Sequence, residues 1–206
     1  MTQTETILVL GIGNVLWADE GFGVRAVEEF DRRYACGDEV TVLDGGTQGL
    51  YLLPYVQQAS HLIVFDAIDY GLAPGTMKVV LDREVPAYMG AKQMSLHQTG
   101  FQDVLAAAEL TGQSPRHLVL IGVQPEELKD YGGSLRPVIR AQVSPSVDIA
   151  AEWLRRWGID VEPRQDPASA SVNAGALALE AYEGGRPSEV DACRIGDPRF
   201  MTRRNS

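Results

Sequence analysis

Short runs of apolar residues, rich in β-branched side chains, recur through the first 123 residues of the chain. These runs are Ile7–Leu10, Val40–Leu43, Leu62–Phe65, Met77–Leu81 and Leu118–Val123. They are continuously apolar and do not alternate with polar residues, which is typical of strands buried on both faces. Segments with the period of an amphipathic helix lie between several of them. The pattern therefore predicts an α/β sheet that is covered on both faces by helices.

Three helical segments stand out from their spacing and their end signals. The first predicted helix is supported by apolar residues at intervals of three or four and by acidic residues at its start. The last is supported by a Pro at its start and a Gly at its end. The predicted helices run from Asp19 or Glu20 to about Tyr34, from about Phe101 to Leu110, and from Pro145, with Ser144 as N-cap, to a stop at Gly158.

Beyond Pro163 the periodicity fades, and several Pro and Gly residues interrupt the chain. We expect residues 1–163 to form one α/β domain and residues 164–206 to be a flexible C-terminal tail. A short helix over residues 174–182 is the one element expected within it.

Composition narrows the class of protein. With 206 residues, of which 45% are hydrophobic, the chain is long enough for one well-buried core. A formal net charge of -10 disfavours binding to nucleic acid or to an anionic membrane. The sequence has neither an apolar segment of about 20 residues nor a basic, then apolar N-terminus, so we expect a cytoplasmic protein. Cys36 and Cys193 are far apart and are expected to be plain thiols.

Three side chains that suit a metal site follow predicted strands. Glu20 comes after the first strand, Asp66 ends the strand Leu62–Phe65, and His97 lies in a predicted polar loop. The carboxyl ends of strands in an open α/β sheet form the crevice where ligands bind, so these residues can converge there. Two carboxylates and an imidazole suit a borderline divalent ion such as nickel or zinc.

Each of these residues also has a structural interpretation. Asp19 and Glu20 could cap the first helix, although two glycines after Glu20 leave it close to the crevice. A buried carboxylate such as Asp66 must be hydrogen-bonded or must bind a ligand. Asp44 closes another strand and is expected to support a turn or to contact substrate.

The remaining histidines and the cysteines offer little chemistry. His61 and His117 precede strands at the opposite edge of the sheet and are expected to be surface or boundary residues. Neither cysteine has a neighbour that would activate it. The sequence also lacks the H-E-x-x-H and G-x-S-x-G motifs, so acyl-enzyme chemistry is not expected.

A strand leading into Gly11-Ile12-Gly13 begins like a dinucleotide-binding motif. Leu16 occupies the position of the third glycine, and Asp19 and Glu20 would face the pyrophosphate. These departures argue against a nucleotide site. The two glycines are still expected to allow a tight turn between strand and helix.

Taken together, several stretches resemble the endopeptidases that mature nickel-iron hydrogenases, in particular the branch that serves membrane-bound uptake hydrogenases. The resemblance covers most of residues 6–160. It rests on Leu10-Gly11-Ile12-Gly13-Asn14-Val15-Leu16 with Asp19-Glu20-Gly21 and Gly23-Val24, Leu43-Asp44-Gly45-Gly46-Thr47, Phe65-Asp66-Ala67, Ala73-Pro74-Gly75-Thr76, Ser95-Leu96-His97-Gln98 and Ile121-Gly122-Val123-Gln124-Pro125.

This resemblance implies a single three-layer α/β/α sandwich with a twisted, mostly parallel sheet of about five strands. It implies an endopeptidase, of a type classed as aspartyl, that removes a C-terminal extension from the hydrogenase large-subunit precursor after nickel insertion. Glu20, Asp66 and His97 match the family's metal-binding residues, which would recognise nickel supplied by the substrate, although other divalent ions could occupy the site. Asp44 matches an aspartate near that site. The segment after residue 164 matches nothing in the family pattern.

Two other functions stay open at this point. One is a nickel-dependent assembly chaperone that binds the precursor without cutting it. The other is a nucleotide-binding oxidoreductase that uses the Gly11-Ile12-Gly13 turn. Shortening of the precursor would distinguish a peptidase from both.

Overall fold

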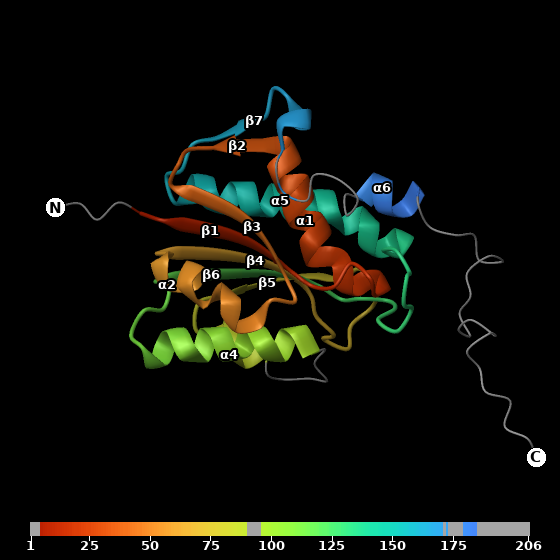
Figure 1. Cartoon of the computed structure of the whole chain (residues 1–206), viewed down its shortest axis with the longest axis horizontal. Coiled ribbons are helices and arrows are strands. Elements are labelled where there is room, and N and C mark those ends of the chain that lie inside the picture. Colours follow the sequence, from red (N-terminus) through yellow and green to blue (C-terminus); the bar gives the residue numbers. More distant parts are fainter. Residues whose placement is uncertain (1–4, 90–95, 171, 173–178, 185–206) are drawn as a thin grey trace, which may run out of the picture.

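A five-stranded sheet forms the centre of the protein (Figure 1). The computed structural model describes residues 5–89, 96–170, 172 and 179–184. The strand order is β3-β1-β4-β6-β5, and only β5 runs antiparallel to its neighbour. The strands are β1 (Ile7–Ile12), β3 (Val40–Gly46), β4 (His61–Ala67), β5 (Met77–Leu81) and β6 (His117–Val123). The prediction of a mostly parallel sheet of about five strands is confirmed.

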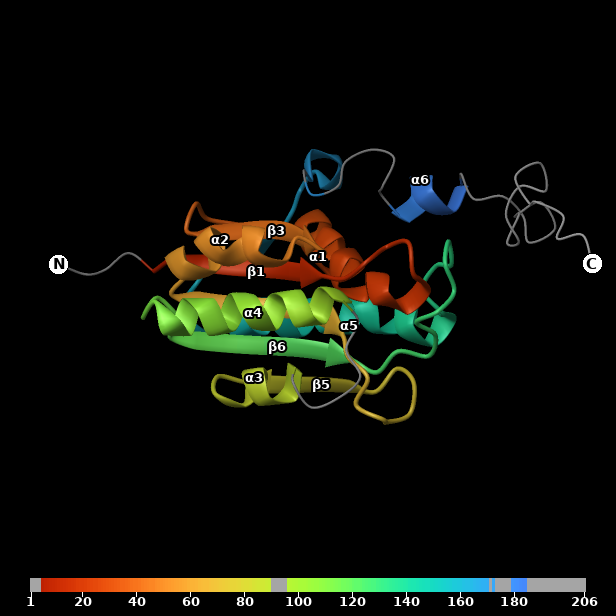
Figure 2. The same ribbon diagram turned by 60° about the horizontal axis from the view of Figure 1, so that its bottom comes forward.

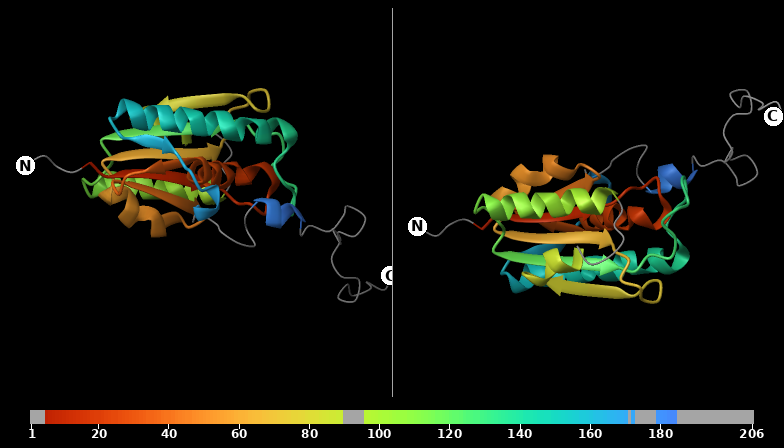
Figure 3. Two further views of the ribbon diagram at one scale, coloured as in Figure 1. Left: turned by 90° about the horizontal axis from the view of Figure 1, so that it is seen from above. Right: turned by 90° about the horizontal axis from the view of Figure 1, so that it is seen from below.

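Helices cover both faces of this sheet, as predicted, and Figures 1 and 3 show the resulting layers. One face carries α1 (Phe22–Arg33) and α5 (Pro137–Arg156); the other carries α2 (Leu53–Gln58), α3 (Glu84–Met89) and α4 (Leu96–Leu110). Smaller elements lie at the edges. They are the 3-10 turns η1 (Ala18–Gly21), η2 (Gly49–Leu52) and η3 (Pro167–Ser169), the two-stranded ribbon β2 (Tyr34–Cys36) and β7 (Val161–Pro163), and α6 (Leu179–Gly184).

Alternation along the strands creates two separate cores. Ile7 and Val9 of β1 pack with α1 and α5, whereas Leu8 and Leu10 pack with α2 and α4. Successive side chains of a strand point to opposite faces, so a continuously apolar strand fills both layers. This is why the sequence shows runs of apolar residues.

The start of α5 differs from the prediction. The helix begins at Pro137, and Pro145 lies inside it. Ser144 does not cap it: its hydroxyl accepts a hydrogen bond from Nη1 of Arg33 (2.8 Å). An internal proline removes one helical hydrogen bond, but residues on both sides of Pro145, such as Ile139 and Val147, are fully buried against the sheet. Tertiary packing therefore carries the helix through a residue that local preference would place at its start.

Two other helix starts were also misplaced. Asp19 and Glu20 lie in η1, and α1 begins only at Phe22. Helix α4 begins at Leu96, so the backbone of His97 is in its first turn and not in a loop. The early turns of α4 pack against η2, a contact between segments about 50 residues apart that periodicity does not reveal.

Part of the chain beyond residue 163 is joined to α1. The Arg164 guanidinium donates to Oδ1 of Asp31 (2.6 Å), and the backbone N–H of Val172 donates to Oδ2 of the same carboxylate (3.0 Å). Asp31 is buried, so these bonds satisfy a group that would be costly to leave alone. The division of the chain at residue 163 stays a prediction.

The helix expected over residues 174–182 corresponds in part to α6. Residues 173–178 lie outside the described structure, and the described helix covers Leu179–Gly184. The carboxylate of Glu183 accepts hydrogen bonds from Ser134 and Arg140. Ser134 lies just before α5, and Arg140 lies in its first turn. Helix α6 therefore lies beside the N-terminal ends of α1 and α5 (Figure 1).

The edge opposite the predicted site holds the other two histidines. His61 and His117 are register partners, and their ring centroids are 4.9 Å apart. His117 is exposed, as expected of a surface residue, whereas His61, the first residue of β4, is buried. Burial lowers the pKa of His61, because a charged imidazole loses its hydration there. Among the described residues, no helix is long and apolar enough to cross a membrane.

Replacing Gly23 by Ala tests the contact between α1 and the sheet. A Cβ at this position would lie 2.2 Å from the carbonyl oxygens of Ile12 and Phe65. We expect a loss of about 1–3 kcal/mol in the free energy of unfolding, measured by urea denaturation. Gly184→Ala is the control, since nothing lies within 4 Å of its Cβ position. Equal unfolding midpoints for the two variants would contradict the prediction.

Candidate functional site

Asp44 and Asp66 lie at the same edge of the sheet. Gly11 of β1 is the register partner of both Asp44 in β3 and Phe65 in β4, and Asp66 follows Phe65. Neighbouring strands are about 4.8 Å apart, so the Cα atoms of the two aspartates lie about 10 Å apart, one on either side of β1. Both are at the carboxyl ends of their strands, where the sequence predicted a site.

Asp66 is the more deeply placed of the two. Its side chain is 0% exposed. Leu62 and Val64 of the same strand pack in the core beside α4, and strand alternation places Asp66 on that same face. Asp44 is only partly buried, and its Oδ1 accepts a hydrogen bond from the N–H of Gly46 (2.8 Å). Asp44 therefore supports the end of β3, where the chain enters the turn at Thr47, in line with one of the two roles predicted for it.

The turn that carries Glu20 packs on the end of β1. The carbonyl oxygen of Glu20 accepts a hydrogen bond from the N–H of Asn14 (3.1 Å). A Cβ on Gly13, whose φ is +143°, would lie 1.9 Å from that oxygen, so only glycine allows this approach. Glu20 is thus held at the junction of β1 and β4, beside the strand that Asp66 ends.

His97 is brought to this edge by its backbone. It lies one turn before Gly100 in α4, and a Cβ on Gly100 would come within 3.3 Å of the Cα of Gly49, in the loop after Asp44. Figure 2 shows α4 running along the sheet. The side chain of His97 lies outside the described structure, so its meeting with Glu20 and Asp66 stays a prediction. Across the described residues, no group of three His, Cys, Asp or Glu side chains forms a metal site.

The glycines that suggested a dinucleotide motif serve packing. A Cβ on Gly11 would lie 2.3 Å from the carbonyl oxygen of Gly23 in α1, and Gly13 receives the Glu20 turn. Protein backbone therefore occupies the approach that a pyrophosphate would need. This supports the sequence argument against a nucleotide site.

Asp19 has a role that the sequence did not reveal. Its carboxylate does not cap the helix but accepts three backbone hydrogen bonds, from Glu126 (2.9 Å), Glu127 (2.8 Å) and Arg136 (2.7 Å). The expectation of a helix cap is wrong because these amides, more than 100 residues away, compete for the carboxylate. No local signal could have found this contact.

Gln124 organises the loop after β4 in a similar way. Its side chain is buried; its Oε1 accepts from the N–H groups of Tyr70 (2.7 Å) and Leu72 (3.1 Å), and its Nε2 donates to Oδ1 of Asp69 (3.0 Å). This loop begins just beyond Asp66. The sequence had marked Gln124 only as part of a family motif.

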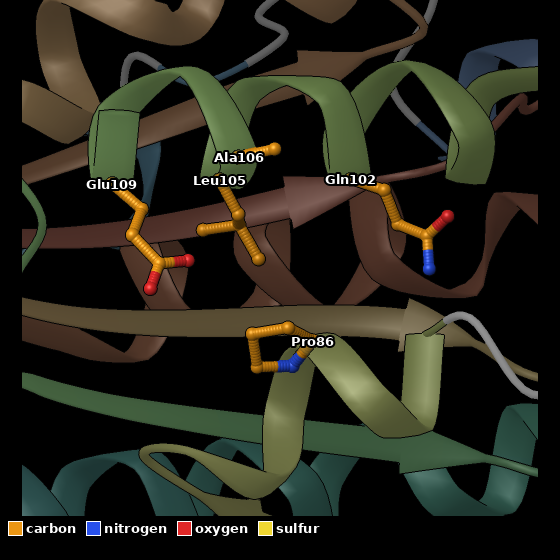
Figure 4. A pocket seen from close by; sticks show the side chains of 5 residues that line it. All are labelled: Pro86, Gln102, Leu105, Ala106 and Glu109. Atoms are coloured by element: carbon orange, nitrogen blue, oxygen red, sulfur yellow. The ribbon is translucent and has the colours of Figure 1, made fainter. Parts of the chain in front are cut away.

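Within the part of the chain that the structure describes, neither Cys36 nor the surface cavity offers a competing site. Burial, followed by the charge of Glu39, raises the pKa of Cys36 to about 11, so at neutral pH it stays a protonated thiol. Cys193 lies outside the described structure. A surface cavity of about 220 Å³ lies between α3 and α4 (Figure 4). Of the residues that line it, only Glu109 is ionisable; the others are Pro86, Gln102, Leu105 and Ala106.

These features define an open-sheet α/β protein with the carboxylates of Asp44 and Asp66 at the carboxyl edge of its strands. Residues 24–153 match the hydrogenase maturation protease family. The chain belongs to that family. This confirms the resemblance seen in the sequence.

Individual relatives agree with this assignment. The hydrogenase expression/formation protein HoxM of Cupriavidus necator is 59% identical over 198 residues, covering 95% of this chain and 98% of the relative. The hydrogenase 2 maturation protease of Escherichia coli is 45% identical over 160 residues, covering 77% and 96%. The solved structure of the E. coli hydrogenase maturating endopeptidase HybD superposes with a TM-score of 0.73 at 44% identity, covering 77% of this chain and 98% of HybD.

The coverage separates long from short relatives. The match to the E. coli protein uses only 77% of this chain, yet it spans almost the whole of that protein. The match to HoxM uses 95% of this chain. The HoxM match must therefore run well beyond residue 163. The segment that matched nothing in the family pattern has a counterpart in this relative.

Replacing Gln124 by Ala tests the support of the loop after β4. The change leaves the N–H groups of Tyr70 and Leu72 without their acceptor, which costs about 1–3 kcal/mol. Urea denaturation should show this loss of stability. The exposed Gln58→Ala variant is the control and should unfold within about 0.5 kcal/mol of the unmodified protein. A stable Gln124→Ala protein would count against the role of this amide.

Proposed function

We propose that the protein is an endopeptidase that removes the C-terminal extension of a nickel-iron hydrogenase large-subunit precursor once nickel has been inserted. The observation that carries the proposal is a fully buried carboxylate, Asp66, at the carboxyl edge of the sheet, beside the packed turn of Glu20, in a chain of the hydrogenase maturation protease family. The name of the E. coli relative, a hydrogenase 2 maturation protease, supports the same activity.

Glu20, Asp66 and His97 are the residues that would bind the nickel of the substrate. Carboxylate oxygens and an imidazole nitrogen suit a borderline divalent ion, and none of the three is a thiolate that would hold the ion strongly. The nickel is cargo of the precursor and not a cofactor of the protease. Once bound, it supplies a Lewis acid that can polarise the scissile carbonyl or activate a water. Other divalent ions could bind the same donors.

The protein's own contribution is to position the donors. Asp66 is fixed at the end of a buried strand, and the Glu20 turn is fixed by its contact with β1. Asp44 holds the neighbouring turn through Gly46. Because the metal ion would arrive only with the substrate, cleavage would be restricted to precursors that already carry nickel.

The partner is therefore the precursor, met in the cytoplasm, with no role for nucleic acid or membrane. The net charge of -10 is consistent with this choice. The non-cleaving assembly chaperone is the second candidate, and it uses the same nickel recognition. The nucleotide-binding oxidoreductase is disfavoured by the packing at Gly11 and Gly13.

Incubating the purified protein with nickel-loaded and nickel-free precursor tests the proposal. We expect mass spectrometry to show a shortened large subunit only for the loaded form. Efficient cleavage of the nickel-free form would refute nickel recognition. An intact loaded precursor that nevertheless co-elutes with the protein would favour the chaperone.

Glu20→Gln and His97→Ala should each abolish processing of loaded precursor, because each removes a proposed nickel ligand. Glu20 is only partly buried, and the backbone of His97 lies in the first turn of α4, so circular dichroism should show an intact fold. Glu162→Gln in β7 and His117→Ala at the opposite edge are matched controls, and both should cleave normally. Full activity in a ligand variant would remove that residue from the site.

A further inference from the structure

The clamp formed by Asp19 joins two distant parts of the chain next to the proposed site. Its side chain is 0% exposed, and the three N–H groups that it binds all belong to the loop 126–136. Its own N–H donates to the carbonyl oxygen of Glu127 (3.1 Å). A buried carboxylate that accepts several backbone hydrogen bonds is held firmly in place. Losing any donor would leave its buried negative charge poorly compensated, which is costly.

Further contacts extend this junction. Trp17 and Tyr131 form a β-bridge, and their rings meet edge to face with centroids 5.2 Å apart. The N–H of Gly132 donates to the carbonyl oxygen of Leu16 (2.7 Å). The residues just before Glu20 are therefore attached to the loop 126–136 along both backbone and side chains.

The turn η1 needs such external support. It has only four residues, no side-chain cap, and a positive φ of 40° at Ala18. A single 3-10 turn makes few hydrogen bonds of its own, and a non-glycine residue with positive φ is unfavourable. Its conformation must be imposed by the contacts around it, and the Asp19 carboxylate alone accepts three hydrogen bonds there.

We propose that Asp19 is a positioning residue for the proposed nickel-recognition site. By fixing η1 to the loop 126–136, it sets where Glu20 stands at the end of β1. The inference rests on the proposed function for its catalytic consequence, but the position of Glu20 can be tested without catalysis. The hydrogen bond from the N–H of Asn14 to the carbonyl oxygen of Glu20 reports directly on that position.

Asp19→Asn is the informative substitution. The amide keeps the shape of the side chain but has one acceptor oxygen, and its NH₂ group must face a backbone N–H. Asp31→Asn is a matched control: Asp31 is also a buried carboxylate that accepts a backbone N–H, but it lies near the far end of α1. Both variants should lose stability through the same loss of buried hydrogen bonds.

Amide hydrogen exchange and cleavage of nickel-loaded precursor are measured on both full-length variants. In Asp19→Asn we expect protection of Asn14, Glu126, Glu127 and Arg136 to fall at least tenfold, with an altered near-ultraviolet circular dichroism signal from Trp17. Its kcat/KM should fall at least tenfold. Asp31→Asn should keep protection at these amides and wild-type kcat/KM.

Retained protection at Asn14 in Asp19→Asn would overturn the inference, whatever the activity. Wild-type kcat/KM in a variant that has lost this protection would also overturn it, because Glu20 would then tolerate displacement. Failure of the unmodified protein to cleave loaded precursor would refute the proposed function instead, and the exchange of Asn14 would still decide whether Asp19 positions Glu20.

Discussion

The close approach of α1 to the sheet fixes the backbone around the proposed site. Gly23 sits so near to β1 and β4 that a Cβ would lie 2.2 Å from a carbonyl oxygen of each strand, and Gly11 faces it without a side chain. Such close contact between backbones leaves no room for a side chain between the start of α1 and the sheet. Glu20 lies three residues before Gly23 and is therefore held near the junction between the two strands. Asp66 lies at the end of one of them, β4.

Long-range polar contacts complete the carboxyl edge of the sheet. Asp19 holds the loop 126–136, and Gln124 holds the loop after β4, so each buried side chain satisfies backbone groups of a different segment. Loops that surround a site are less ordered than the strands that precede them unless something binds them. Preorganised loops would let a substrate bind without the cost of ordering them. The edge therefore combines a rigid sheet with loops fixed by buried acceptors.

The segment after residue 163 distinguishes this chain from the shorter relatives. It is attached through Arg164 to a buried carboxylate of α1, and through Glu183 to the start of α5. The match to HoxM extends into this segment, whereas the E. coli structure is covered by 77% of the chain. Of its described part, α6 lies where α1 and α5 begin, whereas Arg164 and Val172 are bound to Asp31 near the end of α1. Helix α6 thus adjoins the elements that carry the proposed site.

The three-layer architecture, and the sheet edge at which Asp44 and Asp66 lie, follow from the sequence alone. Continuous apolar runs can be buried only between two layers, and parallel strands bring their carboxyl ends to one side, so Asp44 and Asp66 could be placed from their positions alone. Only the tertiary structure decided that α5 runs through Pro145 and that His97 is in the first turn of α4. It also decided that Asp19 binds the loop 126–136. All three have one cause: packing and hydrogen bonds between segments far apart in the chain outweigh local preference, and periodicity and capping rules depend only on neighbours in the chain.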